Sequence, residues 1–178
     1  MSRKLLLSTI VLTALLTGRA NGVAQESSSP ELEGWTVGPS AFGLLWTITD
    51  VGFEKLGGVG LQLGHLKPLG FGFDFRAAYF FPAGRFRAAG VSAILGTAYG
   101  LPAGPALFQL KAGAAGLVGG DNDGTPVVTA GPYVGVGLVG RVTGRLGVQG
   151  DVLARFYVTS GDPAFAPSAA IGLLLLPG

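Results

Sequence analysis

The strongest constraint in this sequence is an alternation of side-chain character with a period of two, most complete over Leu146–Val158. Every second residue of this segment, beginning with its first, is nonpolar. The residues between them include Gln149, Asp151 and Arg155, with Leu153 as the apolar exception. Successive side chains of a β-strand point to opposite faces, whereas no helix would gather these two sets on opposite sides. The segment is therefore predicted to be a strand with one apolar and one polar face.

The same pattern recurs along the chain. Over Leu69–Phe81 the odd positions are aromatic or aliphatic, and Asp74 and Arg76 lie between them. Weaker copies occupy residues 58–64, 89–99, 108–114, 133–138 and 168–176. The segment Trp35–Ile48 has no single phase, which we attribute to a β-bulge near Phe42-Gly43.

Seven turn-rich breaks separate eight of these segments. They lie at Thr49-Asp50, His65 to Pro68, Pro82 to Gly84, Leu101 to Pro105, Gly119 to Thr125, Thr143-Gly144 and Ser160 to Pro163. A membrane-spanning strand needs about ten residues, so eight strands fit easily into the chain after its leader. We expect an all-β protein, an eight-stranded antiparallel up-and-down transmembrane β-barrel over residues 34–178.

The first 24 residues have the composition of a secretory signal peptide. Arg3 and Lys4 precede the mostly apolar run Leu5–Leu16, and small residues follow it. The run is shorter than the roughly 20 residues of a transmembrane helix. We expect cleavage after Gly22-Val23-Ala24, with Ala20-Asn21-Gly22 as the second choice and a retained N-terminal helix as the alternative. Residues 25–33 are expected to form a short spacer.

Charge and composition narrow the function classes. The chain has 12 basic and 10 acidic residues, and the leader holds three of the basic ones, so the mature chain would carry a net charge of −1. This balance gives no support for nucleic-acid binding. Charged residues make up 12% of the chain, about half of what a water-soluble domain normally carries. The absence of cysteine excludes disulfides, thiolate metal sites, a cysteine nucleophile and lipid attachment after the leader.

The glycine-rich polar face of the strands suits the inside of a narrow barrel, where only filling side chains fit. The apolar face is then expected to meet lipid. The residues predicted to line the lumen, in a structural or pore-lining role, are Gln62, Asp74, Arg76, Gln109, Lys111, Gln149, Asp151 and Arg155. Because an unpaired buried ion is costly, Asp74 and Asp151 are expected to form salt bridges with two of the three cations and to plug the lumen. The alternative is that these charges line a narrow ion path.

Aromatic residues fall into two groups near opposite strand ends, as in the interfacial girdles of transmembrane barrels. The group expected at the periplasmic interface is Trp35, Phe71, Tyr99 and Phe108. The group expected at the opposite interface is Tyr79, Phe81, Phe156 and Phe165. Short extracellular loops are expected near Asp50–Lys55, Pro82–Arg85, Gly119–Pro126 and Ser160–Ala166.

The most specific motif is Gly131–Gly137, Gly-Pro-Tyr-Val-Gly-Val-Gly, with weaker echoes at Gly38–Gly43 and Ala166–Ser168. It is similar to the Pro-Tyr-x-Gly-x-Gly segment that enters a strand in the general outer-membrane β-barrel domain. From Gly34 to Gly178 the chain resembles the small outer-membrane β-barrel families represented by the OmpA transmembrane domain, OmpX and OmpW. The resemblance implies a monomeric, porin-like protein of a Gram-negative outer membrane, with lipid and the outer-membrane assembly machinery as partners. Independently of the resemblance, we expect no enzymatic activity, because the sequence offers no convergent set of His, Ser and acidic residues, and we expect no cofactor and no nucleic-acid partner.

Two features depart from that family pattern. Such barrels usually end in an aromatic residue, whereas this chain ends Leu176-Pro177-Gly178. Pro39, Pro132 and Pro167 fall in or beside predicted strands. Because proline cannot donate a ladder hydrogen bond, we expect these prolines at the starts of strands near the membrane edge.

Three motifs could carry chemistry, and a structural interpretation is favoured for each. Gly135-x-Gly137-x-x-Gly140 matches the dinucleotide fingerprint by letter but is followed by another alternating segment in place of a helix. Asp121–Gly124 lacks the later glutamate of a calcium loop and predicts a hairpin tip. His65, the only histidine, is expected in a periplasmic turn rather than as the base of a lipid-modifying hydrolase.

Two other fold classes remain as alternatives. A secreted soluble barrel that binds a hydrophobic ligand would have the two faces reversed. A polytopic helical membrane protein could use residues 88–110, which contain no charge, although several glycines and prolines interrupt them.

Overall fold

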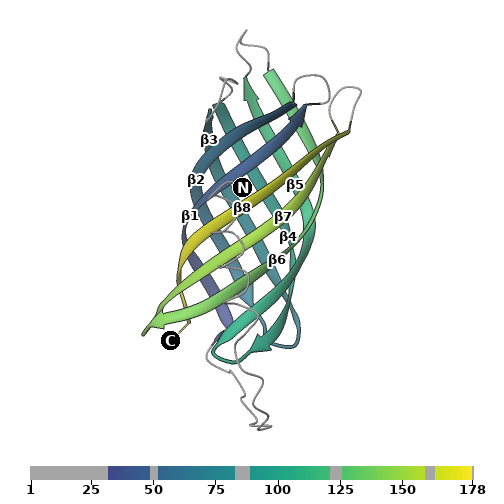
Figure 1. Ribbon diagram of the computed structural model, residues 1–178. Helices are drawn as coiled ribbons and strands as arrows, with labels where there is room; N and C mark the ends of the chain where they lie inside the picture. The colour runs from purple at the N-terminus through teal and green to yellow at the C-terminus, as the bar shows by residue number, and fades with distance from the viewer. Residues whose placement is uncertain (1–31, 49–51, 83–88, 121–125, 159–162, 178) are drawn as a thin grey trace, which may run out of the picture.

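The strands close into a single antiparallel barrel. The computed structural model describes residues 32–48, 52–82, 89–120, 126–158 and 163–177. Each strand pairs with the next and β8 pairs with β1, which confirms the predicted fold class (Figure 1). The strands are β1 (Gly34–Ile48), β2 (Gly52–Leu66), β3 (Phe71–Pro82), β4 (Ala89–Ala103), β5 (Ala106–Gly120), β6 (Pro126–Thr143), β7 (Leu146–Val158) and β8 (Pro163–Leu175). The predicted signal peptide and the Asp121–Gly124 motif lie outside the described residues.

The strands extend further than the turn-forming residues indicate. Residues 52–55 belong to β2, residues 101–103 to β4 and residues 163–166 to β8, although we expected loops there. Residues 119–120 and Pro126 likewise end β5 and begin β6. The expectation was wrong because ladder pairing continues up to the hairpin, as in the Ala103–Ala106 pair.

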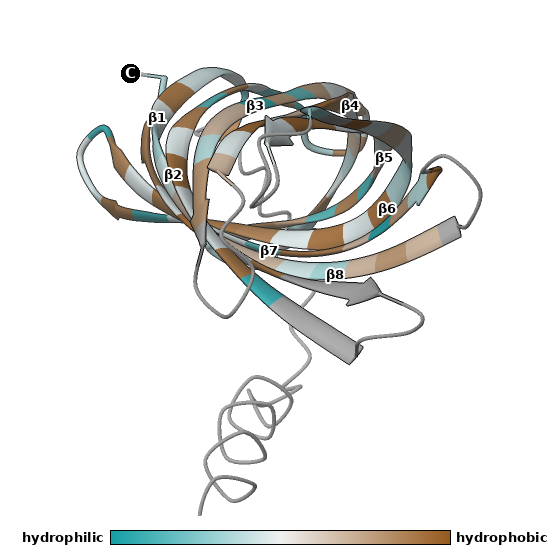
Figure 2. Ribbon diagram, turned by 90° about the horizontal axis from the view of Figure 1, so that it is seen from above, coloured by the Kyte–Doolittle hydropathy of each residue, from teal (hydrophilic) through white to brown (hydrophobic). Residues whose placement is uncertain are grey.

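The apolar face of the barrel points outward. Val152 is 59% exposed, whereas its neighbours Asp151 and Leu153 are 4% and 1% exposed. Seen from above, hydrophobic and hydrophilic residues alternate along the strands of the closed ring (Figure 2). A reversed-face soluble barrel is therefore wrong for this chain.

The helical alternative is also wrong. From residue 89 to residue 110 the uncharged stretch forms all of β4 and the start of β5. In the part of the chain that the structure describes, no helix has the length and apolar character needed to cross a membrane.

Strand β1 alternates without interruption as far as its burial is described, from Trp35 to Leu44, so the predicted bulge near Phe42-Gly43 is wrong. Ser40, Phe42 and Leu44 are buried, and Ala41 and Gly43 are exposed. The pairing of β1 with β2 runs in one register from Gly34 to Ile48. The phase was hidden in the sequence because the outward residues Pro39, Ala41 and Gly43 carry little hydrophobic signal and the inward ones mix polar with apolar. The β6–β7 pairing, in contrast, shifts register between Arg141 and Thr143.

The three prolines lie inside strands, which corrects our expectation that they would mark strand starts. Pro39 is in β1, Pro132 in β6 and Pro167 in β8. The β1–β8 pairs stop at Val37–Leu175 and resume at Ser40–Gly172. The β6–β7 pairs skip residues 131 and 132 in the same way. Pro39 and Pro132 thus interrupt the ladder toward one neighbour only, and both remain paired on the other side. Pro167 pairs with Ala154 of β7, and the β1–β8 pairs end at the next residue, Ser168.

Apolar side chains close the lumen at two levels. The lower cluster, at the end where β1 begins and β8 ends, consists of Leu32, Leu66, Leu107, Val139, Leu174 and Leu176. The upper cluster consists of Phe42, Leu44, Leu56, Ala78, Phe80, Ile94, Ala115, Leu117, Tyr133, Leu153, Tyr157, Ala164 and Ala166. Leu32 belongs to the segment that we expected to be a spacer. Leu176, beyond the last strand, is held by a hydrogen bond from its backbone N–H to the carbonyl oxygen of Arg145 at 2.7 Å.

Candidate functional site

Four charged side chains from three strands meet inside the barrel and form what we call the charge network. They are Asp74 and Arg76 of β3, Lys111 of β5 and Asp151 of β7. Asp74 and Arg76 are two residues apart in one strand, so the pleat points both of them inward. Such a cluster is what the sequence predicted from the charges on the polar faces.

The two carboxylates bridge the two cations. Asp151 accepts from Arg76 Nη2 at 2.6 Å, and its other oxygen lies 2.9 Å from Lys111 Nζ. Asp74 accepts from Lys111 Nζ at 3.0 Å and lies 4.0 Å from Arg76 Nη2. Gln149 Nε2 also donates to both oxygens of Asp151, at 3.1 and 2.9 Å. Because the four charges alternate in sign and are buried, each is stabilised by its partners rather than by water.

Arg155 lies outside this network, although it is only 2% exposed. Its Nη1 lies 3.3 Å from Ser92 Oγ and 3.4 Å from the hydroxyl of Tyr157. Its guanidinium carbon lies 5.6 Å from the centre of the Phe42 ring, a cation–π distance. The sequence could not name Ser92 and Phe42 as its partners, because both come from distant strands. The only available sign was that Ser92 occupies an inward position in its segment.

Gln62 serves the β1–β8 seam instead of the charge network. Its Nε2 donates to the carbonyl oxygen of Leu173 at 3.4 Å. The register of β1 and β8 places Leu173 opposite Pro39, which has no N–H to offer that carbonyl. Gly172 leaves room for the amide, because a Cβ there would overlap Gln62 Nε2. Gln62 thus partly replaces the ladder hydrogen bond that proline removes.

Gln109 is also buried, but its side chain contributes fewer hydrogen bonds than that of Gln62 among the described residues. Its Oε1, like that of Gln62, has no hydrogen-bond partner among the described residues, but unlike Gln62 it has no bond to a backbone carbonyl there. It lines a void of about 10 Å³ together with Gln62, Lys111 and Leu174, a space of about the size of one water molecule. All eight predicted lumen residues are therefore inside the barrel, but they divide into the four-residue charge network, Gln149 that donates to it, a separate arginine and two further glutamines.

The two glutamines give a matched pair of substitutions. Gln62→Leu is expected to lower the free energy of unfolding by about 1–3 kcal/mol, because the Leu173 carbonyl, which has no N–H of Pro39 opposite it, loses its side-chain donor. Gln109→Leu is expected to be neutral or stabilising, since it removes an unpaired buried acceptor. Urea unfolding of both variants in lipid vesicles measures the difference. Equal losses in the two variants would contradict this role for Gln62.

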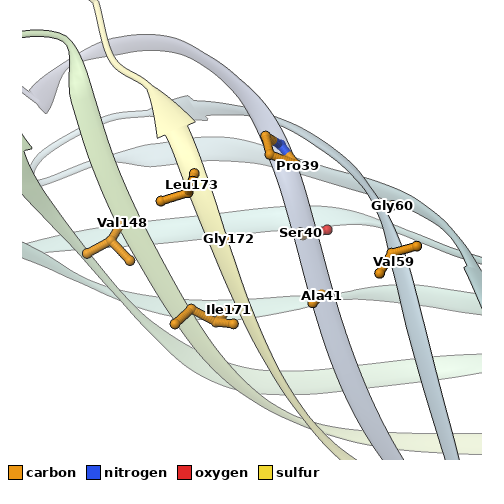
Figure 3. Close-up of a pocket in the computed structure, with 9 residues that line it drawn as sticks. All are labelled: Pro39, Ser40, Ala41, Val59, Gly60, Val148, Ile171, Gly172 and Leu173. Atoms are coloured by element: carbon orange, nitrogen blue, oxygen red, sulfur yellow. The ribbon is translucent and has the colours of Figure 1, made fainter.

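A shallow groove of about 380 Å³ lies on the outside of the same seam (Figure 3). It spans β7, β8, β1 and β2 and is lined by Pro39, Ser40, Ala41, Val59, Gly60, Val148, Ile171, Gly172 and Leu173. Small residues on adjacent strands produce the depression. No charged side chain lines it, so its chemistry is that of the surrounding apolar belt.

The remaining motifs are structural. The Gly135–Gly140 motif lies inside β6, not at a strand-to-helix turn, so it has no phosphate-binding geometry. His65 is the second-last residue of β2, and its ring lies 5.2 Å from that of Trp35. Our placement of His65 in a turn was wrong because β2 continues to Leu66. Among the described residues, no three His, Asp or Glu side chains are grouped as a metal site.

Aromatic side chains gather near both ends of the outer surface. At the lower end the rings of Phe71 and Tyr99 lie 5.1 Å apart, and Trp35 lies 6.2 Å from Phe73. At the upper end the rings of Phe156 and Phe165 lie 5.2 Å apart. Two such belts flanking an apolar band are typical of transmembrane barrels.

Comparisons with known proteins agree with this architecture. The crystal structure of neisserial surface protein A (NspA) superimposes with a TM-score of 0.61 at 14% identity, covering 81% of this chain and 97% of that one. The N-terminal β-barrel domain of Pseudomonas aeruginosa OprF gives a TM-score of 0.51 at 14% identity, covering 78% of this chain and 96% of that one. No protein-family model matches the chain, and no curated protein matches it in sequence. At this identity the likeness concerns the fold, which is that of the small eight-stranded outer-membrane barrels.

Proposed function

We propose that this protein is a monomeric outer-membrane barrel of a Gram-negative bacterium with a structural, non-conducting role. In this proposal residues 1–24 are removed after export, residues 25–33 are a spacer except where Leu32 enters the barrel, and residues 34–178 span the membrane. The outward apolar surface and the two aromatic belts support contact with lipid. In that setting an acyl chain of the bilayer would fill the groove at the β1–β8 seam.

The observation that carries the structural role is the layering of the lumen. The charge network lies between the lower and the upper apolar cluster. Two voids that adjoin it within the described part of the lumen measure about 10 Å³ each, about one water molecule. Ions cross a pore only along a continuous wet path, and apolar constrictions block such a path by excluding water.

Catalysis receives no support from the site. His65 faces the outer surface against Trp35 and not the charged lumen. The two lumen carboxylates each form a salt bridge with a cation, so neither is free to act as a catalytic acid or base.

Planar-bilayer recording of the purified mature protein tests the proposal. We expect no stable conductance steps after insertion, with heat-modifiable migration in gels as the check that the barrel is folded. An open barrel inserted under the same conditions serves as the positive control. Reproducible steps that scale with salt concentration would instead establish the narrow pore.

A further inference from the structure

A second void lies between the charge network and the upper cluster. It measures about 10 Å³ and is lined by Phe42, Arg76, Ala78, Ser92, Ile94 and Arg155. Two of these six residues are arginines from strands β3 and β7, 3% and 2% exposed. Two like charges therefore border one small space.

Both arginines have nitrogen atoms that lack an acceptor. Arg76 uses Nη2 to bind Asp151, but its Nε and Nη1 have no hydrogen-bond partner among the described residues. Arg155 uses Nη1, and its Nε likewise has none within that part of the chain. A buried guanidinium N–H without an acceptor is costly, so these three nitrogen atoms favour an acceptor that the chain does not supply.

The charges around the void are not balanced. Within the described lumen, the cations Arg76, Lys111 and Arg155 face only two carboxylates, Asp74 and Asp151. A water molecule could accept hydrogen bonds but would not reduce the repulsion between the two guanidinium groups. An anion would do both.

The size and lining of the void limit which anion fits. A space of about one water molecule excludes phosphate, sulfate and carboxylate ligands. Phe42, Ala78 and Ile94 exclude a hydration shell, so the ion would be bare and held by nitrogen donors and the Ser92 hydroxyl. The composition of the site is thus that expected for a single small halide.

We propose that this void is a binding site for one monatomic anion, chloride under cellular conditions, held between Arg76 and Arg155. An anion bound there would compensate the positive charge that Asp74 and Asp151 do not neutralise. It depends on the side chains of the described lumen and not on whether the barrel conducts.

Crystallography of the wild-type protein with bromide in place of chloride tests the site directly. The expected result is an anomalous difference peak inside the barrel, within hydrogen-bond reach of both arginines. A void that is empty, or filled by density without anomalous signal, would overturn the proposal, as would bromide found only on the surface.

Chloride-dependent stability provides an independent readout in solution. Above the dissociation constant, each tenfold rise in chloride at constant ionic strength, with gluconate as the replacing anion, should raise the folding equilibrium constant up to tenfold. Arg155→Met should abolish this dependence, whereas Arg145→Met, the same change at an exposed arginine, should preserve it. A dependence that survives in Arg155→Met would place chloride elsewhere and refute the site. If Arg155→Met does not fold, the wild type decides the question alone. A wild-type stability that does not change with chloride concentration would then refute the site.

Discussion

Replacing Asp151 with asparagine is expected to lower the free energy of unfolding by about 3–5 kcal/mol, the usual loss when one partner of a buried ion pair is removed. The side chain is 4% exposed and contacts Arg76, Lys111 and Gln149. Asparagine has nearly the same volume, so the loss would report charge and not a cavity. Urea unfolding in lipid vesicles, followed by tryptophan fluorescence, measures it.

Two controls separate the charge network from a general effect of the substitution. Glu33→Gln makes the same chemical change at an exposed position and should alter stability by no more than about 0.5 kcal/mol. The double variant Asp151→Asn with Arg76→Met removes one charge of each sign. Its loss should be smaller than the sum of the single losses by about 0.5–3 kcal/mol. A loss below about 1 kcal/mol for Asp151→Asn would mean that the carboxylate is solvated, as in an exposed pair.

Replacing Gly113 with alanine is expected to destabilise the barrel by about 3 kcal/mol, the upper part of the range for overpacking. Gly113 of β5 pairs with Gly96 of β4, and the ring of Tyr133 covers both. A Cβ at Gly113 would overlap the carbonyl oxygen of Leu95, which is backbone and cannot rotate away. The glycines of the inner face thus allow the sheet to curve into a narrow barrel. They also leave space for the side chains that fill the lumen.

Gly116→Ala is the matched control in the same strand. The nearest atom to a Cβ at Gly116 is the carbonyl oxygen of Thr129 at 3.8 Å, an ordinary contact. Its effect on the free energy of unfolding should lie within about 0.5 kcal/mol. Comparable losses for the two alanine variants would indicate that strand propensity, and not close packing around Gly113, explains the glycine content.

The sequence predicted the barrel most reliably where outward residues are uniformly apolar, as in β7. It predicted less in β1, where Pro39, Ala41 and Gly43 face outward and carry little hydrophobic signal. We predicted the wrong positions for the prolines because the sequence shows that proline lacks an N–H. It does not show which neighbouring strand loses the hydrogen bond. That information lies in the register, which only the closed barrel defines.

The candidate site was predictable in composition but not in connectivity. The inward pattern identifies Asp74, Arg76, Lys111 and Asp151 as neighbours of one lumen. It does not indicate that Arg155 would be left apart with Ser92, 63 residues away in the chain. Nor does it indicate that Leu32 and Leu176, outside the strands, would complete the lower cluster.

Strand β7 offers the most direct measurement of which flank of each strand meets hydrocarbon. Because the chain contains no cysteine, single cysteines at successive positions from Val148 to Ala154 can each carry a nitroxide label in lipid vesicles. We predict high accessibility to oxygen at Val148, Gly150, Val152 and Ala154, and low accessibility to oxygen and to a water-soluble relaxant at the positions between them. Water-soluble relaxant reaching Val148 and Val152, or accessibility without a period of two, would contradict the membrane barrel described above.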